Sequence, residues 1–173
     1  MQATTPSPTQ AQFHAAINAA SGRWLSACLG ITRDQALAED CVQEALVTAW
    51  AKRDQFRGDS VLTTWIHRIA VNAALQALRQ RNRRVFVLID VEMADETRGP
   101  DEVCGLDQFG GDLAEAMAAL SDLERVCFVL KHLEQWRLAE IASHLDLGAG
   151  PVKQALFRAL KKLRAALPAD GNP

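Results

Sequence analysis

The most distinctive chemistry of the chain lies between residues 151 and 167, where apolar residues recur at helical spacing. On a helical projection, the face opposite the apolar one consists of Lys153, Gln154, Phe157, Arg158, Lys161, Lys162 and Arg164. This face carries five cations and no acid, with an aromatic side chain near its centre. A helix of this kind fits the major groove of DNA, with its basic side chains on phosphates. The alternative is a solvated surface helix, but such a helix mixes acids with its cations and leaves the position of Phe157 unexplained.

The residues just before this helix complete a predicted helix-turn-helix. The stretch 137–145 has a helical pattern whose inward-facing residues are Leu138, Ile141, Ala142 and Leu145. Gly148 and Gly150 mark the short turn that follows. Pro151 suits the first helical position, because its missing N–H costs nothing there.

A second stripe of polar residues lies on a long helix that the sequence predicts over 61–84. The stripe consists of residues three and four positions apart, which share one helical face: Trp65, Arg68, Asn72, Gln76 and Arg79. It runs into the basic segment RQRNRR at 79–84. Trp rings stack on bases, and amide and Arg side chains hydrogen-bond base edges. A polar stripe that faces water beside a half-buried Trp remains the alternative on these residues alone.

The helix predicted over 33–52 carries carboxylates opposite its apolar face. Asp40 and Glu44 lie four residues apart, with Glu39 adjacent. Like charges at this spacing cost an isolated helix about 0.2–0.5 kcal/mol. A partner with basic groups would offset this repulsion, although a solvated acidic face is the simpler interpretation of these residues by themselves.

The net charge of −2 over 173 residues hides an uneven distribution. Residues 79–84 carry four basic groups, and residues 125–173 carry eight basic groups against four acids. Between them, residues 85–124 carry eleven acids and one basic group. Two basic blocks separated by an acidic middle are typical of two anion-binding modules joined by a solvated connector, although helical surfaces that scatter charge without such a role give the same pattern.

Other features of the composition exclude several classes of protein. No apolar run approaches the ~18–20 residues of a membrane span, and MQATTPSPTQ lacks the basic and apolar regions of a secretory signal. We therefore expect a cytoplasmic protein without membrane insertion. Cys28, Cys41, Cys104 and Cys127 have no metal-binding spacing, and the four His form no ligand pair. We expect free thiols, no metal site, no cofactor and no catalytic residues.

The abundance of Ala and Leu, with few β-branched runs, predicts an all-α fold of two small helical domains joined by a flexible linker. Helices are expected over about 12–29 with Gly30 as the C-cap, and over 33–52, 61–84, 113–132, 137–145 and 151–167. The expected domain plan is a disordered tail over 1–11, a first domain over 12–84, an acidic linker over 85–112, a second domain over 113–167 and a tail over 168–173.

Three segments in this order resemble the extracytoplasmic-function sigma factors, the two-domain class of bacterial RNA polymerase sigma subunits. The segments are AEDCVQEALVTAW (38–50), FRGDSVLTTWIHRIAVNAALQALRQRNRR (56–84) and LSDLERVCFVLKHLEQWRLAEIASHLDLGAGPVKQALFRALKKLR (120–164). The resemblance implies a sigma region 2 helical bundle in the first domain and a sigma region 4 helix-turn-helix in the second. It also implies a protein that joins core RNA polymerase and directs transcription from promoters, with an anti-sigma factor as a further expected partner.

The resemblance also implies roles for individual residues. The contacts to the β′ clamp helices of the polymerase would come from Glu39, Asp40, Gln43 and Glu44. The −10 element would be opened and recognised by Phe56, Ser60, Trp65, Arg68, Asn72, Ala73, Gln76 and Arg79. The −35 element would be recognised by Lys153, Gln154, Phe157, Arg158 and Lys161. The surface around this last helix would meet the β flap, and the acidic linker would occupy the RNA exit path.

Two departures from the family pattern bear on specificity. Gly150-Pro151-Val152-Lys153-Gln154-Ala155 replaces the Gly-Thr-Val-Lys-Ser-Arg found in many members, and Gln76 replaces an Asp that is frequent in the −10 helix. Promoter sequences of relatives are therefore not carried over. Two rival functions are a free-standing helix-turn-helix regulator that uses only 113–167, and a thiol redox sensor or enzyme that uses Cys41 or Cys127.

Overall fold

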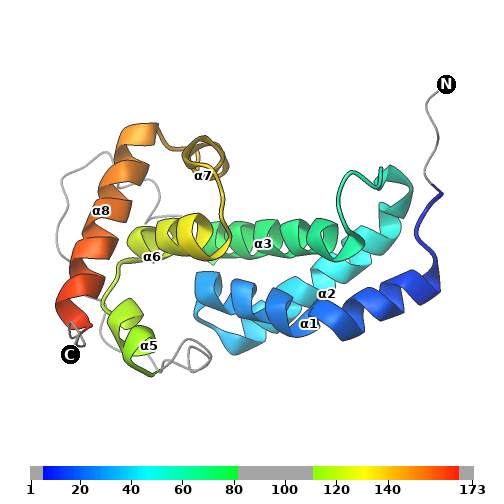
Figure 1. Ribbon diagram of the computed structural model, residues 1–173, viewed down its shortest axis with the longest axis horizontal. Coiled ribbons are helices and arrows are strands. Elements are labelled where there is room, and N and C mark those ends of the chain that lie inside the picture. The colour runs from blue at the N-terminus through cyan, green and yellow to red at the C-terminus, as the bar shows by residue number, and fades with distance from the viewer. Residues whose placement is uncertain (1–5, 82–110, 168–173) are drawn as a thin grey trace, which may run out of the picture. The chain divides into compact units, whose positions relative to one another are not determined.

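The computed structural model describes residues 6–81 and 111–167, and these divide between two compact units, 1–92 and 93–173. Every regular element in the described ranges is a helix, and none is a strand (Figure 1). The prediction of an all-α fold is therefore confirmed. Residues 1–5, 82–110 and 168–173 lie outside the described residues. They include most of the predicted linker, Cys104, the end of the RQRNRR segment and the C-terminal tail.

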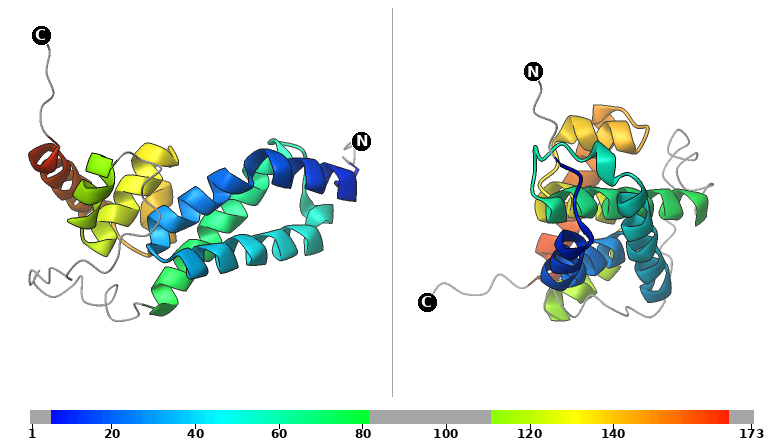
Figure 2. Two further views of the ribbon diagram at one scale, coloured as in Figure 1. Left: turned by 90° about the horizontal axis from the view of Figure 1, so that it is seen from below. Right: turned by 90° about the vertical axis from the view of Figure 1, so that its right-hand side faces the viewer.

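Within residues 6–81, the first unit contains three long helices and one short 3₁₀ turn: α1 (Gln10–Thr32), α2 (Gln35–Ala51), η1 (Arg53–Gln55) and α3 (Leu62–Arg81). Each long helix packs against the other two (Figures 1 and 2). In this core, the side chains of Trp24, Ile31 and Ile66 are inaccessible to solvent. Small buried residues such as Ala45 and Ala70 let the helices approach closely around them.

The ends of α1 differ from the prediction of a helix over 12–29. Thr9 accepts a hydrogen bond from the backbone N–H of Gln12, whose side chain in turn accepts from the N–H of Thr9. This capping box starts the helix at Gln10, and Pro8 before it is buried. Part of the tail expected to be disordered therefore has defined structure. The helix also continues through Gly30, because Arg33 provides the left-handed C-cap at φ 55°.

The second helix begins two residues later than its predicted start at 33. Asp34 is its N-cap, and Asp34 Oδ1 accepts from the backbone N–H of Leu37 at 3.0 Å. Asp34 Oδ2 also accepts from Arg81 Nη1 at 3.1 Å, which ties the described end of α3 to the start of α2. The helix predicted over 61–84 is thus observed from Leu62, and its last three residues lie outside the described ranges.

The second unit contains α5 (Gly111–Ala118), α6 (Asp122–Phe128), the π-helical turn η4 (Val129–Leu133), α7 (Leu138–His144) and α8 (Ala149–Ala166). The single helix predicted over 113–132 is interrupted, because Ser121 and Glu124 form a capping box that starts a new helix. Propensity favours helix on both sides of this break, so the pattern of apolar residues alone did not reveal it.

The predicted helix-turn-helix is present as α7, a short turn and α8 (Figure 1). After α7, Asp146 adopts a left-handed conformation at φ 53°, and the N–H of Leu147 donates to the carbonyl of Ala142 at 2.9 Å. Gly148 is the N-cap of α8, so Pro151 is the third helical residue rather than the first. Its missing N–H is still tolerated, because the first turn of a helix leaves its N–H groups unbonded.

Candidate nucleic-acid interface

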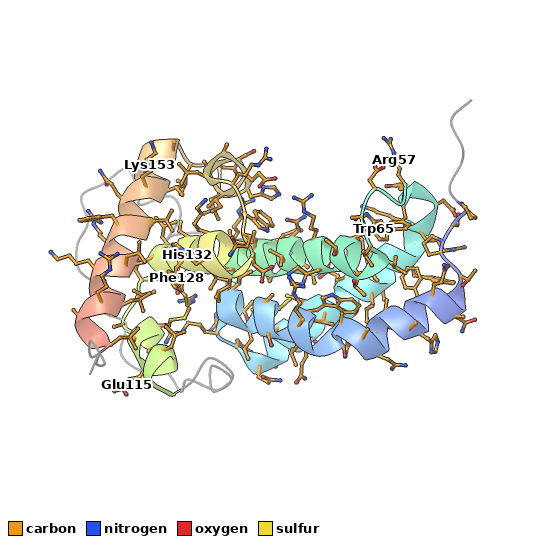
Figure 3. The ribbon with its side chains drawn as sticks, in the orientation of Figure 1. Arg57, Trp65, Glu115, Phe128, His132 and Lys153 are labelled. Atoms are coloured by element: carbon orange, nitrogen blue, oxygen red, sulfur yellow. The ribbon has the colours of Figure 1, made fainter. Side chains whose placement is uncertain are left out.

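The face of α8 predicted to bind DNA is mostly exposed between Lys153 and Lys161. Lys153, Gln154, Phe157 and Lys161 are exposed, and Arg158 is half-buried. Together these five side chains line a shallow hollow on the surface. Lys153 projects from the N-terminal part of the helix (Figure 3). The opposite face is buried in the second unit through Val152, Ala155, Leu156, Ala159 and Leu163.

Phe157 is the least expected member of this face. Its side chain is 69% exposed, although a phenyl ring is among the most favourable groups to bury. Folding of the isolated chain gains little from this residue. An exposed ring flanked by Lys153, Arg158 and Lys161 can instead make apolar contact with bases while the cations contact phosphates.

Lys162, one of the five predicted cations of α8, has a structural partner. Its Nζ donates to Glu124 Oε2 at 2.8 Å. The same oxygen accepts from the backbone N–H of Ser121 at 3.0 Å, so the buried carboxylate joins the start of α6 to the last turns of α8. This ion pair ties α8 to the start of α6, so Lys162 has a structural role in addition to any contact with DNA.

The polar stripe of α3 lies on one face of that helix. Arg68, Asn72 and Gln76 are exposed, whereas Trp65, Ala73 and Arg79 are half-buried. The side of α3 that packs into the unit is mostly apolar and buried, and it includes Ile66, Ala70, Val71, Ala74 and Leu78. The structure therefore presents amide and guanidinium groups along about three helical turns, which suits hydrogen bonding to base edges and phosphates.

The loop before α3 adds further residues at the start of this stripe. The ring of Phe56 lies against that of Trp65, with 5.4 Å between their centroids. Gly58 allows the loop to turn, because its φ of 74° is open to glycine. Ser60 is exposed beyond the turn, and Arg57 projects from the loop while Trp65 lies against the helix (Figure 3). An aromatic pair beside exposed polar groups can stack on an unpaired base.

The acidic face of α2 is exposed at all four predicted positions: Glu39, Asp40, Gln43 and Glu44. The structure adds Val47, which the sequence analysis did not select and whose side chain is 71% exposed. Its position three residues after Glu44 and seven after Asp40 places it on the same face, and this spacing was the available signal. Because the carboxylates around Val47 would repel DNA phosphates, this face suits a protein partner rather than DNA.

The described thiols lack the environment that a reactive cysteine needs. Cys28, Cys41 and Cys127 are buried and free. Burial, reinforced by the charges of Glu44 and Asp40, raises the pKa of Cys41 to about 11. Burial also raises the pKa of Cys127 to about 12. Thiolate is the nucleophilic form, so these values oppose the redox-sensor interpretation.

The described ranges hold neither a cluster of metal ligands nor a membrane-spanning helix. Within residues 6–81 and 111–167, no three His, Cys, Asp or Glu side chains gather closely enough to hold a metal ion. None of the helices in those ranges combines the length and apolar character needed to cross a membrane. The surfaces of interest in the described part of the chain are therefore the three polar faces on α2, α3 and α8.

Comparison with known families and proteins gives matches in both units. The family description "Sigma-70 region 2" matches residues 17–84, and "Sigma-70, region 4" matches residues 111–163. ECF RNA polymerase sigma factor SigL of Mycobacterium tuberculosis is 34% identical over 143 residues, covering 80% of this chain and 79% of that protein. The ECF RNA polymerase sigma-E factor of Escherichia coli is 31% identical, covering 69% and 68%. SigG of Mycobacterium tuberculosis is 29% identical, but this chain spans only 46% of its length.

Two solved structures share the fold. The sigma factor RpoE of Bartonella quintana, in complex with the anti-sigma factor NepR, superposes with a TM-score of 0.58 at 25% identity. The match covers 92% of this chain and 98% of RpoE. CnrH, in complex with the cytosolic domain of CnrY, has a TM-score of 0.53 at 23% identity and covers 94% and 92% of the two chains.

Proposed function

The chain belongs to the extracytoplasmic-function family of RNA polymerase sigma factors, and from that membership we propose that it directs transcription initiation. It binds core RNA polymerase, recognises the −35 and −10 elements of its promoters, and melts DNA at the −10 element. The observation that carries this proposal is the pair of exposed, base-compatible faces, one on α3 and one on α8, in two compact units.

The α8 face supports recognition of duplex DNA at the −35 element. Its cations extend from Lys153 to Lys161 along the helix, whereas its buried face anchors it to α6 and α7. Such a helix can enter the major groove with its N-terminal residues on base edges. Because Ala155 is buried and Gln154 is exposed, base readout at the start of the helix rests on Lys153 and Gln154.

The loop before α3 and the stripe along α3 support melting at the −10 element. Extruding a base costs a few kcal/mol of stacking and pairing. The Phe56–Trp65 pair beside the exposed Ser60 supports capture of the extruded base, and such stacking contributes about 1–3 kcal/mol per base. Binding free energy from the rest of the complex then offsets the remaining cost of opening. The protein performs no covalent chemistry in this scheme, because the polymerase synthesises the RNA.

The α2 face supports binding to the β′ clamp helices. Glu39, Asp40 and Glu44 offer carboxylates, and Val47 offers an apolar centre that solvent otherwise covers. A partner with basic groups around an apolar contact would relieve the repulsion among these acids and bury Val47. The surface around α8 would meet the β flap. These partners place the protein in the cytoplasm.

An anti-sigma factor is a further proposed partner. RpoE of Bartonella quintana was solved with NepR, and CnrH was solved with part of CnrY. By similarity to these chains, we expect a dedicated inhibitor to bind this protein and to compete with core polymerase for it.

Run-off transcription with purified core polymerase and a genomic fragment library tests the function. The chain should co-elute with core polymerase that lacks a sigma subunit, and defined promoters should emerge. On those promoters, Asn72→Ala should weaken use of the −10 element and Lys153→Ala use of the −35 element, each by about tenfold for the loss of one base contact. Asn18→Ala and Arg23→Ala are matched controls, because both residues are exposed on α1.

The outcomes separate the proposal from its main rival. Failure to bind core polymerase, or transcription unaffected by both Asn72→Ala and Lys153→Ala, would contradict the proposed function or its assigned faces. A free-standing regulator would instead shift duplex DNA in a gel without polymerase, and the exposed faces of α2 and α3 would have no function.

A further inference from the structure

The N-terminal end of α1 lies at the same end of the first unit as η1 and the loop that follows it (Figures 1 and 2). Ser7 Oγ donates a hydrogen bond of 2.6 Å to Asp54 Oδ1, across 47 positions of the sequence. This length is typical of a hydroxyl bonded to a carboxylate, which is roughly twice as strong as a bond between neutral groups. The segment just before α1 is therefore attached to the centre of η1.

Arg53, the neighbour of Asp54 in η1, is linked to the N-terminal end of α1 through the ring of Trp50. Phe13, on the second turn of α1, packs edge-on against Trp50 with 5.1 Å between ring centroids. The guanidinium of Arg53 lies 4.4 Å from the centroid of the Trp50 ring, and Arg53 Nη1 donates to the carbonyl of Trp50 at 2.8 Å. Arg53 therefore reaches α1 only through Trp50, whereas Asp54 is bonded to Ser7 in the segment before α1, so the two connections are independent.

The position of Phe56 follows directly from that of η1. The N–H of Phe56 donates to the carbonyl of Arg53 at 3.2 Å, and its ring lies 5.4 Å from that of Trp65. Only Gln55 lies between Asp54 and Phe56, so a movement of η1 displaces Phe56 relative to Trp65. The loop that contains Phe56 and Ser60 is otherwise exposed, and exposed loops have little of their own structure to hold a stacking platform in place.

We infer that residues 6–9 act as a strap that positions the base-capturing loop, with Ser7 and Asp54 as positioning residues. The inference rests on the proposed function, because it concerns how this same loop binds an extruded base. The strap touches no DNA. It restricts η1 so that the Phe56–Trp65 pair is arranged before DNA binds, which lowers the cost of ordering the loop around the base.

The test measures discrimination by the loop rather than overall affinity. Wild-type holoenzyme is bound to single-stranded non-template oligonucleotides that span the −10 element of a promoter mapped by run-off transcription. A matched series replaces each nucleotide in turn with an abasic site. The position with the largest loss of affinity identifies the captured base. The discrimination ratio is the affinity for the intact oligonucleotide divided by the affinity for the oligonucleotide with an abasic site at that position.

The strap predicts which variants change this ratio. Ser7→Ala and Asp54→Ala should each lower it about three- to tenfold, in line with the loss of one hydrogen bond between exposed groups. Ser7→Asp should lower it further by setting two carboxylates against each other. Ser7→Thr should retain the ratio because it retains the hydroxyl. Ser26→Ala is the matched control, since it removes a hydroxyl that donates to Gly22 O elsewhere on α1.

A general loss of stability would reduce the fraction of active protein without changing the discrimination ratio. A change in the ratio therefore reports on how the Phe56–Trp65 pair is positioned. An unchanged ratio in both Ser7→Ala and Asp54→Ala would overturn the strap. An equal drop of the discrimination ratio in the control Ser26→Ala and in Ser7→Ala would also overturn it. The proposed function has a separate outcome, because it fails already if wild-type holoenzyme maps no promoter.

Discussion

At the scale of single residues, we expect Phe157 to contribute to DNA binding but little to the stability of the fold. Its side chain is 69% exposed, whereas its neighbour Leu156 is 9% exposed on the opposite face of α8. Phe157→Ala should therefore change the free energy of unfolding by less than about 0.5 kcal/mol, yet weaken binding to a −35 duplex roughly tenfold. Leu156→Ala should cost about 2–5 kcal/mol of stability.

Urea denaturation and promoter binding by holoenzyme measure the two effects of these substitutions on the same preparations. If Phe157→Ala destabilises the protein as much as Leu156→Ala does, the ring belongs to the core rather than to the DNA face.

The buried thiols make a prediction about pH. Their pKa values, about 11 for Cys41 and about 12 for Cys127, lie above the ordinary value of 9.0 because burial disfavours the thiolate. The unfolded chain loses these protons from about pH 9 upwards while the folded chain keeps them. Their contribution to stability is therefore fully present below pH 9 and is lost as pH rises towards 11–12.

Ellman's reagent and denaturation at pH 8 and pH 10 measure this behaviour. In a Cys104→Ser variant, the thiols should react slowly at pH 8 when folded and rapidly in denaturant. The fall in stability between the two pH values should shrink when Cys41 is replaced by Ala. Fast reaction of the folded protein at pH 8 would instead favour a thiol-based sensor.

At the scale of elements, helix ends depend on residues that the apolar pattern does not contain. Asp34 is an example, because its two oxygens serve two helices. Asp34→Ala should cost about 1–2 kcal/mol by removing the N-cap of α2 and the contact to Arg81. Asp34→Asn keeps a capping oxygen and should cost only a few tenths of a kcal/mol, since the ion pair is half-exposed.

Urea denaturation of Asp34→Ala, Asp34→Asn and Arg81→Ala measures how much the N-cap and the ion pair each contribute to stability. Equal losses for Asp34→Ala and Asp34→Asn would mean that the charge on Asp34, rather than the cap, stabilises this junction.

At the scale of the whole molecule, each unit has its own buried core. Trp24, Ile31 and Ile66 lie in the first, and Met117, Leu130 and Ile141 in the second. Fragments 1–92 and 93–173 should therefore each give a helical circular dichroism spectrum and a cooperative thermal transition. Neither fragment alone should support transcription with core polymerase. A fragment that remains unfolded would show that its core depends on the other unit.

Much of the architecture was predictable from the sequence because it is encoded locally. The spacing of apolar residues identifies the helices and separates the buried side of α8, with Val152 and Leu163, from its basic side. It fails where a single residue changes the backbone. Ser121 starts a new helix inside an apparently continuous pattern, and Arg33 rather than Gly30 ends α1.

Taken alone, the sequence determined that the chain forms two helical units and which faces of α2, α3 and α8 are polar, because a period of 3.6 residues is readable within one helix. Tertiary structure decided which polar groups are already paired. Lys162 meets Glu124 from 38 positions away, and Ser7 meets Asp54 from 47 positions away. Such pairs depend on how separate segments pack in space, and the spacing of residues along one helix does not predict that packing.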